Sequence, residues 1–278
     1  MLLEALEFTQ NSIQSAYLNW RTCVEKTWNV KILSSVDYLF EKPGKCIRPY
    51  FLSLIYSIEK KEKRQDFWLN KDHAQLALAL EFVHVFSLVH DDLPCMDNDE
   101  FRRGRKTLHA LWGEAHALLV GDALLNEVYS MLAQLNLESE VKLKTIQAFS
   151  VAVGPAGLIG GQQFDIDEVE SGKINNIEFL EQIHRQKTGA LFQLALKIAL
   201  MLQSQESLKK EEWANGLGFY FQVQDDALDS GPVEKILGAR EAKSFKRKLY
   251  EKTLNEAGQL WSSAAPQEFF REMSQRKA

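Results

Sequence analysis

The sequence predicts an all-α protein, and three observations support this fold class. Apolar residues recur mostly at spacings of three and four, which is the period of an amphipathic helix. Only six prolines occur in 278 residues, and no strand-like alternation or fixed-period repeat is found. No linker is rich enough in proline, glycine or serine to divide the chain. We therefore expect a single-domain helical bundle over residues 1–278.

The N-terminal part is expected to contain two helices and a polar segment. Residues 2–29 form an amphipathic stretch that breaks toward a turn at 42–44, Lys-Pro-Gly. Pro49 suits the first turn of the next helix, whose run 50–56 is heavily apolar. Residues 58–72 are polar and are expected to form an exposed helix end and a loop.

Residues 74–90 are apolar on almost every side, the pattern of a helix buried in the middle of a bundle. Pro94 ends or distorts this helix, because the residue before a proline is disfavoured in the helical region. Further helices are expected at about 112–134, 137–152, 157–171, 176–203, 208–229, 233–262 and 266–276.

Composition excludes several classes of function. A net charge of −5 makes nucleic acid a poor candidate for a partner. Every long apolar run is broken by a charged residue or histidine, and the N-terminus carries acids where a signal peptide carries bases, so neither a membrane span nor export is expected. The three cysteines form no CxxC pair, which argues against disulfides and zinc and favours the reducing cytoplasm.

The charge pattern at residues 91–106 stands out from the rest of the chain. Five acids lie within 91–100, here called the first acidic segment, and four bases follow within 102–106. The acids follow a buried helix at its C-terminal end, where the helix dipole disfavours negative charge. A bound cation would reverse that penalty, and Mg²⁺ prefers carboxylate oxygens and keeps positions open for phosphates. A solvated loop is the alternative for an isolated charge run.

A second acidic segment, residues 225–229, ends another largely apolar helix. At helical spacing Asp225 and Asp229 lie on one face, as do Gln222, Asp226 and Asp229. Like charges at this spacing repel each other, so a structural explanation without a ligand is weak. A helix end in solvent is the alternative for one such segment alone. Two acidic segments that each end a buried helix favour magnesium ions that together chelate one diphosphate.

Basic residues stand where a bound diphosphate would need them. Arg102 and Arg103 follow the first acidic segment, and Lys187 precedes Thr188, whose hydroxyl can add a hydrogen bond. Arginine matches pairs of phosphate oxygens, whereas lysine acts as a point charge. Each base alone would be an ordinary surface residue.

Three further residues are candidates for an anion pocket. Lys45 and Arg48 stand just ahead of a helix start, where backbone N–H groups favour an anion. His84 lies seven residues before Asp91 and projects from nearly the same stripe of the helix. A core histidine with satisfied hydrogen bonds is an equally good interpretation of His84.

In order along the chain, these motifs resemble the trans-isoprenyl diphosphate synthases, the family of farnesyl and geranylgeranyl diphosphate synthases. The resemblance is to the short-chain members, most of all the bacterial farnesyl diphosphate synthases, and it covers about residues 40–229. The motifs are Gly44-Lys45-x-x-Arg48-Pro49, Asp91-Asp92-x4-Asp97 with Arg102-Arg103-Gly104, Gly121-Asp122-Ala123-Leu124-Leu125, Gly160-Gly161-Gln162, Lys187-Thr188-Gly189 and Gln222-x-Gln224-Asp225-Asp226-x-x-Asp229.

The resemblance implies an isoprenoid-synthase bundle around a central cavity, a homodimer and three Mg²⁺ ions with substrate bound. It implies that the metal is held by Asp91, Asp97 and Asp225, with Asp92 and Asp229 close by. The allylic diphosphate would be held by Lys187, Thr188, Gln222 and Arg102. Isopentenyl diphosphate would be held in a metal-free pocket by Lys45, Arg48, His84 and Arg103.

The implied reaction begins when the allylic C–O bond ionises, because magnesium and the bases stabilise the departing diphosphate. The isopentenyl double bond then attacks the carbocation, and a proton is lost. By resemblance, Phe86, five residues before Asp91, and Ser87, one turn before it, form the pocket floor and favour a C15 farnesyl product. The run 93–99 also resembles the members that form the C20 geranylgeranyl product.

Two departures from the family leave other functions open. The lysine-containing loop that normally follows Asp229 is missing, so Lys235, Arg240 or Lys243 would have to replace its lysines, and Cys46 stands where a second base is usual. The chain could therefore be a weakly active or inactive homologue that pairs with an active synthase. A class I terpene cyclase uses similar metal chemistry but would not need the pocket of Lys45, Arg48 and His84.

Overall fold

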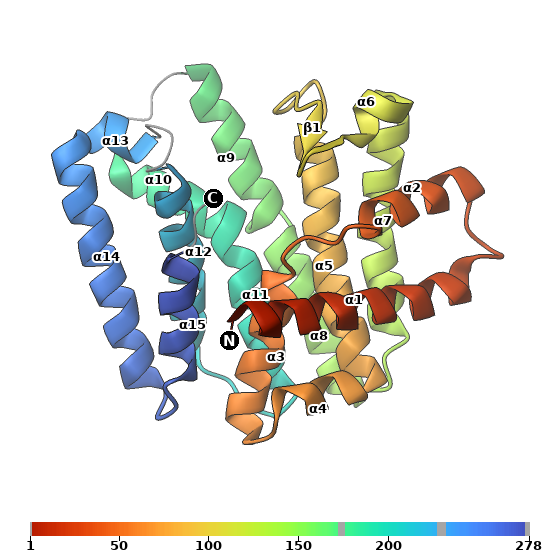
Figure 1. The fold of residues 1–278 in the computed structure, drawn as a ribbon, viewed down its shortest axis with the longest axis horizontal. Helices are drawn as coiled ribbons and strands as arrows, with labels where there is room; N and C mark the ends of the chain where they lie inside the picture. Colours follow the sequence, from red (N-terminus) through yellow and green to blue (C-terminus); the bar gives the residue numbers. More distant parts are fainter. Residues whose placement is uncertain (1, 172–175, 227–231, 276–278) are drawn as a thin grey trace. The chain divides into compact units, whose positions relative to one another are not determined.

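The computed structural model describes residues 2–171, 176–226 and 232–275, and these residues are mostly helical (Figure 1). The predicted all-α fold class is therefore confirmed. Contacts between Cα atoms group the chain into two compact units. Unit 1 comprises residues 3–50 and 65–142, and unit 2 comprises residues 51–64 and 143–278. The single domain over residues 1–278 stays a prediction.

Unit 1 contains the N-terminal helices, the buried helix α5 and one small hairpin. In chain order its elements are α1 (Leu2–Val24), α2 (Val30–Phe40), the start of α3 (Ile47–Lys60), most of α4 (Arg64–Leu69), α5 (Lys71–Asp91), β1 (Phe101–Arg102), β2 (Arg105–Lys106), α6 (Leu108–Trp112) and α7 (Glu114–Ala133). The two strands pair antiparallel, with Arg102 opposite Arg105.

Unit 2 contains the C-terminal helices and one π-helical turn. In chain order its elements are the rest of α3, most of α8 (Ser139–Val153), α9 (Leu158–Ser171), α10 (Ile177–His184), the π-helix η1 (Arg185–Gly189), α11 (Ala190–Met201), α12 (Leu208–Asp226), α13 (Pro232–Leu237), α14 (Ala239–Leu260) and α15 (Ala265–Ser274). Helix α12 packs against α11, η1 and α14, so it is the central helix of this unit.

Helix α5 confirms the helix that the apolar pattern at 74–90 predicts. Most of its residues are buried, and it packs along α7 (Figure 1). It begins at Lys71, earlier than predicted, because the Asn70 side chain accepts hydrogen bonds from the backbone N–H groups of Asp72 and His73. It ends at Asp91, three residues before Pro94.

Several expectations for the N-terminal half were wrong. The amphipathic stretch 2–29 ends as a helix at Val24, and a separate helix, α2, follows after the N-cap Asn29. The segment 58–72 contains the short helix α4, whose Phe67 is fully buried. A six-residue helix with a single buried side chain shows too little apolar periodicity to be predicted from the sequence.

Two predicted helices are each divided by a glycine. The predicted helix 112–134 becomes α6 and α7, and the predicted helix 233–262 becomes α13 and α14. The dividing residues, Gly113 and Gly238, have φ of 88° and 78°, a left-handed region that glycine enters at little cost. Each is also the N-cap of the helix that follows it.

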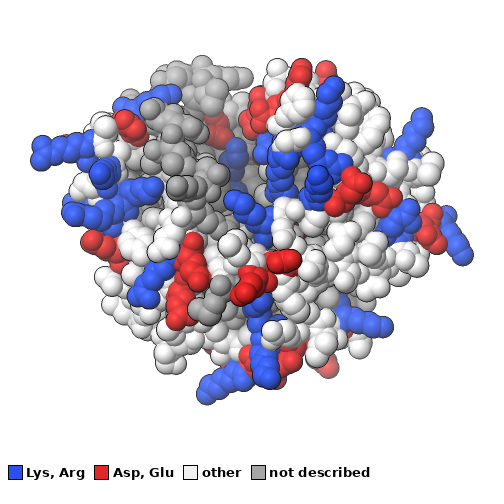
Figure 2. Space-filling view, in the orientation of Figure 1, with Lys and Arg blue, Asp and Glu red and all other residues white. Residues whose placement is uncertain are grey.

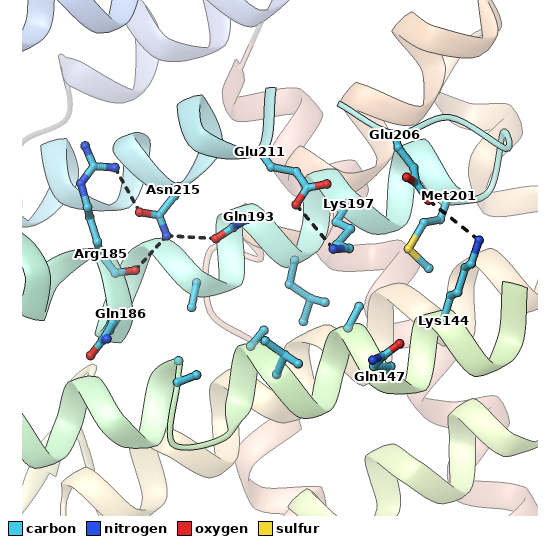
Figure 3. Close-up of a pocket in the computed structure, with 17 residues that line it drawn as sticks. Lys144, Gln147, Arg185, Gln186, Gln193, Lys197, Met201, Glu206, Glu211 and Asn215 are labelled. Carbon is cyan, nitrogen blue, oxygen red and sulfur yellow. Dashed lines mark hydrogen bonds and ion pairs between the residues drawn. The ribbon is translucent and has the colours of Figure 1, made fainter. Parts of the chain in front are cut away.

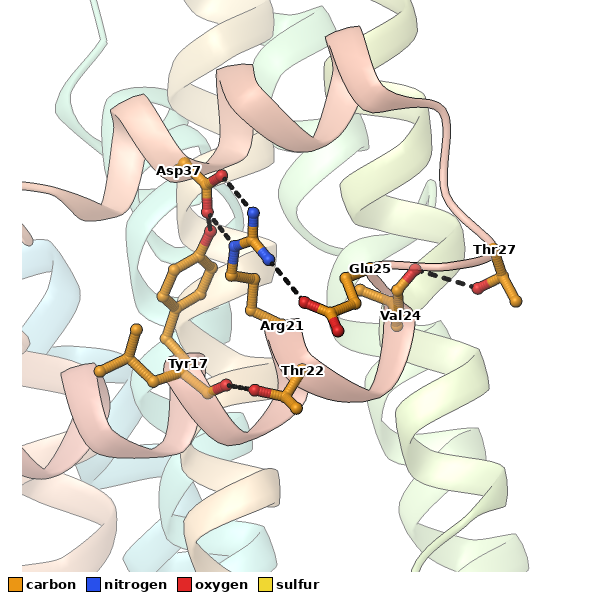
Figure 4. Close-up of polar contacts among 8 residues, drawn as sticks. Tyr17, Arg21, Thr22, Val24, Glu25, Thr27 and Asp37 are labelled. Carbon is orange, nitrogen blue, oxygen red and sulfur yellow. Dashed lines mark hydrogen bonds and ion pairs between the residues drawn. The ribbon is translucent and has the colours of Figure 1, made fainter.

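A polar network joins α1 to α2 around the carboxylate of Asp37 (Figure 4). The Tyr17 hydroxyl donates to Asp37 Oδ1 at 2.5 Å, and Arg21 donates from Nε to the same oxygen at 2.9 Å. Arg21 Nη2 also donates to Asp37 Oδ2 at 3.2 Å. Burial and this carboxylate raise the pKa of Tyr17. Because Tyr17 is almost fully buried, its hydroxyl depends on Asp37 as an acceptor.

Replacing Asp37 by alanine is expected to lower the free energy of unfolding by about 1–2 kcal/mol, because the buried Tyr17 hydroxyl loses its acceptor. Urea denaturation followed by circular dichroism measures this change. Glu25→Ala is the control, because it removes only the exposed i,i+4 ion pair with Arg21 and should have a smaller effect. Equal effects of the two substitutions would contradict the assignment.

Candidate active site

The first acidic segment begins where α5 ends, and a compact loop brings it back toward that helix end. The backbone N–H of Asp97 donates to the carbonyl of Asp91 at 2.9 Å, and that of Asn98 donates to the carbonyl of Leu93 at 3.1 Å. Asn98 has a φ of 55°, a conformation that asparagine tolerates better than most residues. The loop therefore joins the backbones of Asp91 and Asp97, two of the predicted metal ligands.

Asp92 lies in a different setting, because its carboxylate is buried against an arginine. Arg102 Nε lies 2.5 Å from Asp92 Oδ1, and Arg102 Nη2 lies 3.3 Å from Asp99 Oδ2. Burial raises the pKa of Asp92, while the hydrogen bond and charge of Arg102 oppose that rise. In this arrangement Arg102 fixes the acidic loop and compensates the charge of Asp92.

The hairpin β1–β2 carries both predicted arginines and is attached to the end of α2. Arg105 stacks on Tyr38 with 3.7 Å between its Cζ and the ring centroid, and it donates to the Tyr38 carbonyl at 3.0 Å and to Glu41 at 2.7 Å. The Tyr38 hydroxyl donates to the Lys106 carbonyl at 2.8 Å. Neither the hairpin nor this anchor was predicted, because two-residue strands leave no periodic signal.

A basic cluster in unit 1 brings together three of the predicted anion-binding residues, Arg48, His84 and Arg103. Burial, Arg48 and Arg103 lower the pKa of His84, in that order of size, so the imidazole is neutral at pH 7. Burial also lowers the pKa of Arg48 to about 10, which still leaves it charged. The guanidinium of Arg103 lies so close to Gly44 that a methyl group there would overlap it. Lys45 is exposed.

Buried Glu81 belongs to the same basic cluster and was missed by sequence reasoning. Its side chain is 2% exposed, burial raises its pKa, and the charges of Arg48 and Arg103 counteract that rise. Glu81 precedes His84 by three residues, so the helical period places the two on neighbouring positions of one face. That spacing could have indicated a carboxylate among the bases.

His84 is expected to remain neutral at pH 6.5, where an ordinary histidine is half protonated. Because the folded protein has the lower pKa, His84 contributes a loss of stability as pH falls below about 6.5. NMR of labelled imidazole nitrogens measures its protonation, His84→Gln identifies its signal, and the urea-unfolded chain supplies the ordinary titration. A half-protonated His84 at pH 6.5 in the folded state would contradict this expectation.

The two predicted chain-length residues lie on α5 near its C-terminal end. Phe86 is buried and makes an edge-to-face contact with His90 at 5.8 Å between ring centroids. Ser87 is half-buried and donates to the His84 carbonyl at 2.9 Å. The imidazole of His90 packs against Gly121, where a Cβ atom would overlap it.

In unit 2, the π-helix η1 presents Lys187 and Thr188. Single π-helical turns are rare and are frequently found at functional sites. Lys187 Nζ lies 2.6 Å from Asp165 Oδ2 on α9, and the Thr188 hydroxyl donates to Gln222 Oε1 on α12 at 3.2 Å. Three predicted residues, Lys187, Thr188 and Gln222, are therefore brought together.

Asp165 was missed, although its position could have been inferred. Helix α9 approaches η1 so closely that a Cβ atom on Gly161 would overlap the backbone of Gln186 and Lys187. Asp165 follows Gly161 by four residues and so lies on the same face of α9. An aspartate one helical turn after Gly161 could therefore have been recognised as a partner for Lys187.

A pocket of about 370 Å³ lies behind the π-helix, lined by α8, α11 and α12 (Figure 3). Asn215 lies in one wall of this pocket: its Nδ2 donates to the Arg185 carbonyl at 3.0 Å and to Gln193 at 3.2 Å, and its Oδ1 accepts from Arg185 Nη1 at 3.1 Å. These hydrogen bonds hold Arg185, the first residue of η1. They therefore help to set the orientation of Lys187 and Thr188, which follow in the same π-helix.

The second acidic segment is described only in part. Helix α12 includes the backbones of Asp225 and Asp226, whereas Asp229 lies outside the described residues. Within the part of the chain that the structure describes, no group of three or more His, Cys, Asp or Glu side chains is placed to hold a metal ion. The carboxylates of Asp91 and Asp97 are hard oxygen donors of the kind that magnesium prefers, so the donor set fits that ion.

None of the helices in the described part of the chain is long and apolar enough to cross a membrane.

Comparison with known proteins matches residues 29–241 to the polyprenyl synthetase family model. The farnesyl diphosphate synthase of Geobacillus stearothermophilus is 37% identical over 216 residues, 74% of this chain and 69% of that protein. The geranylgeranyl diphosphate synthase of Cyanophora paradoxa is 36% identical over 220 residues, 77% of this chain and 71% of that protein.

Solved structures agree with these sequence relatives. An FPP/GFPP synthase from Zymomonas mobilis has a TM-score of 0.83 at 25% identity and covers 99% of both chains. A geranyltransferase from Helicobacter pylori, complexed with magnesium and isoprenyl diphosphate, has a TM-score of 0.75 at 26% identity and covers 97% of this chain and 96% of that one. The resemblance seen in the motifs is confirmed, and the chain belongs to the polyprenyl synthetase family.

Proposed function

We propose that the protein is a magnesium-dependent prenyltransferase that condenses isopentenyl diphosphate with dimethylallyl or geranyl diphosphate to give farnesyl diphosphate. The observation that carries this proposal is the grouping of Lys187 and Thr188 with Gln222, which precedes the second acidic segment on α12. The family match and the farnesyl diphosphate synthases among the relatives support it.

The allylic substrate is assigned to the polar groups around the acidic segments. Lys187, Thr188, Gln222 and Arg102 bind its diphosphate, and the metal is assigned to Asp91, Asp92, Asp97, Asp225 and Asp229. Bound there, magnesium would offset the negative charge that grows on the leaving diphosphate. The residues of this chain hold the allylic carbon and its leaving group in one orientation, so that ionisation needs little reorganisation.

Isopentenyl diphosphate is assigned to the basic cluster of unit 1. Arg48 and Arg103 supply positive charge, Lys45 can add a third base from the surface, and neutral His84 supplies a hydrogen bond. Glu81 holds the two arginines in a buried setting and limits their mutual repulsion. The apolar side chains of α5, Phe86 among them, keep water from the carbocation, which water would quench.

An inactive homologue that pairs with an active synthase remains the second candidate. It is favoured by the short connection after the second acidic segment, since α13 already begins at Pro232. A terpene cyclase is disfavoured, because it has no use for the pocket of Arg48, His84 and Arg103.

One assay separates these functions. Purified protein is incubated with Mg²⁺, labelled isopentenyl diphosphate and either dimethylallyl or geranyl diphosphate, and the products are sized. Farnesyl diphosphate supports the proposal, geranylgeranyl diphosphate assigns the C20 product, and cyclic hydrocarbon assigns a cyclase. Absence of any elongated product across a magnesium titration would leave the partner-subunit function.

We also propose a single-domain chain that forms a cytoplasmic homodimer. Cys23, Cys46 and Cys95 are free thiols, which suits a reducing compartment. Helices α6 and α7 leave large apolar side chains exposed, an arrangement typical of an interaction surface. These side chains are Trp112 at 47%, Leu118 at 45% and Leu119 at 55% exposure.

The double substitution Leu118→Glu and Leu119→Glu is expected to produce a monomer, because charges replace apolar contacts at the proposed interface. Size-exclusion chromatography with light scattering measures the mass in solution. Leu69→Glu, at a position 80% exposed elsewhere in unit 1, is the control and should leave a dimer. A monomeric wild-type protein would contradict the homodimer.

A further inference from the structure

A groove on unit 2 is lined by basic side chains from the first half of α14. It has a volume of about 700 Å³ and lies along α12, α14 and the C-terminal end of α15. Its basic residues are Arg240, Lys243, Lys246 and Arg247, and its other lining residues are Tyr220, Ser244, Tyr250, Ser274 and Gln275. Figure 2 shows Lys and Arg gathered over the end of α14 that adjoins α13.

Within the described part of the chain, these bases have no acidic counterpart in the groove. The lining contains no aspartate or glutamate, and the stretch 239–248 holds five bases and a single acid, Glu241. Among the residues that the structure describes, none of the four basic lining residues forms an ion pair within 4.0 Å. The chain as a whole has a net charge of −5, so this concentration of positive charge is local. An external anion is the counter-charge that the groove lacks.

The uncharged wall of the groove is held in place by aromatic packing. Tyr250 stacks on Phe270 at 5.2 Å between ring centroids, and Tyr220 meets the same ring edge-on at 4.8 Å. The Tyr220 hydroxyl is hydrogen-bonded to Ser274, and burial raises its pKa to about 12, so it stays a neutral phenol. The bases therefore face a fixed wall of uncharged side chains.

The spacing of the bases suits a ligand with more than one phosphate. Arg240, Lys243 and Arg247 lie at i, i+3 and i+7, on one stripe of α14. The stripe extends about 10 Å, at 1.5 Å per residue. Arginine forks bind pairs of phosphate oxygens, and lysine adds a point charge.

The groove lies on a different face of α12 from the candidate active site. Tyr220 and Gln222 are two residues apart and therefore about 200° apart around the helix. Gln222 accepts the Thr188 hydroxyl, whereas Tyr220 packs on Phe270. Arg240 and Lys243 thus line a groove on the side of Tyr220, which argues against their replacing lysines of the missing loop.

We propose that this groove binds a multivalent phosphate-bearing anion, either free in solution or as the headgroup of an anionic lipid. The proposal is independent of the prenyl-transfer reaction.

The test compares two double variants of the same charge. Lys243→Gln with Arg247→Gln removes two bases from the groove, and Lys248→Gln with Lys252→Gln removes two bases of α14 that do not line it. Inorganic diphosphate is titrated by calorimetry in the presence of EDTA. Both variants keep Arg48 and Arg103, so diphosphate bound in unit 1 contributes equally. We expect the groove variant to lose about tenfold in affinity for one binding event, and the control variant to retain it.

A second arm measures sedimentation with vesicles of phosphatidylcholine containing phosphatidylserine. Loss of diphosphate binding in the groove variant supports a free anion, and loss of vesicle binding alone supports a lipid headgroup. Equal behaviour of wild type and groove variant in both arms would overturn the proposal, as would equal losses in the two variants. Lys243 and Arg247 are exposed, so unchanged thermal melting is expected and excludes misfolding as the cause.

Discussion

Replacing Asp91 by asparagine is expected to lower kcat for prenyl transfer by on the order of 10²–10³-fold, the effect of removing one preorganised electrostatic group. Asp91 is the last residue of α5, where the helix dipole is negative, and its backbone is joined to that of Asp97. An asparagine there keeps the size of the side chain but loses the charge that the proposed magnesium site requires. In steady-state assays across a magnesium titration, Asp91→Asn should need a higher Mg²⁺ concentration than wild type to reach half of its maximal rate.

Glu100→Gln is the control for Asp91→Asn, because Glu100 is an exposed acid of the same segment and is not among the proposed ligands. It should leave kcat and the magnesium dependence close to wild type. If Asp91→Asn kept the wild-type kcat and magnesium dependence, the assignment of metal to this segment would be wrong.

The fold could be predicted where a long segment is buried, because burial makes the sequence apolar over many consecutive residues. Helix α5 is apolar on nearly every side, so its type and approximate limits followed from residues 74–90. Short elements were missed for the opposite reason. Helix α4 depends on the single buried Phe67, and the hairpin β1–β2 depends on the contacts of Arg105 with Tyr38 and Glu41. A tertiary contact of this kind leaves no local pattern.

The residues of the candidate site could be predicted where they belong to a sequence motif. Lys187, Thr188 and Gln222 were identified from the sequence, and the structure brings them together. The carboxylates that support the predicted bases were not identified, because each acts through a residue of another element. Asp165 pairs with Lys187, and Glu81 acts on Arg48 and Arg103. The π-helical turn was also missed, since one extra residue in a turn is invisible to a period of three or four.

Phe86→Ala is expected to shift the main product from C15 toward C20. Phe86 is buried near the C-terminal end of α5, five residues before Asp91, and its removal leaves a cavity the size of a phenyl ring. If that ring closes the pocket for the growing chain, a longer product fits once it is gone. The substitution should also cost about 3–5 kcal/mol in stability, as for other buried phenylalanines. Products are dephosphorylated and sized by chromatography.

Leu80→Ala separates chain length from a general loosening of α5. Leu80 is also fully buried on α5, but it precedes Phe86 by six residues and so lies on a different side of the helix. It should lose stability by about 2–5 kcal/mol and keep the wild-type product. A C20 product from both variants would attribute the shift to loosening, and an unchanged product from folded Phe86→Ala protein would remove Phe86 from the pocket floor. Only a shift confined to Phe86→Ala assigns the limit on chain length to this ring.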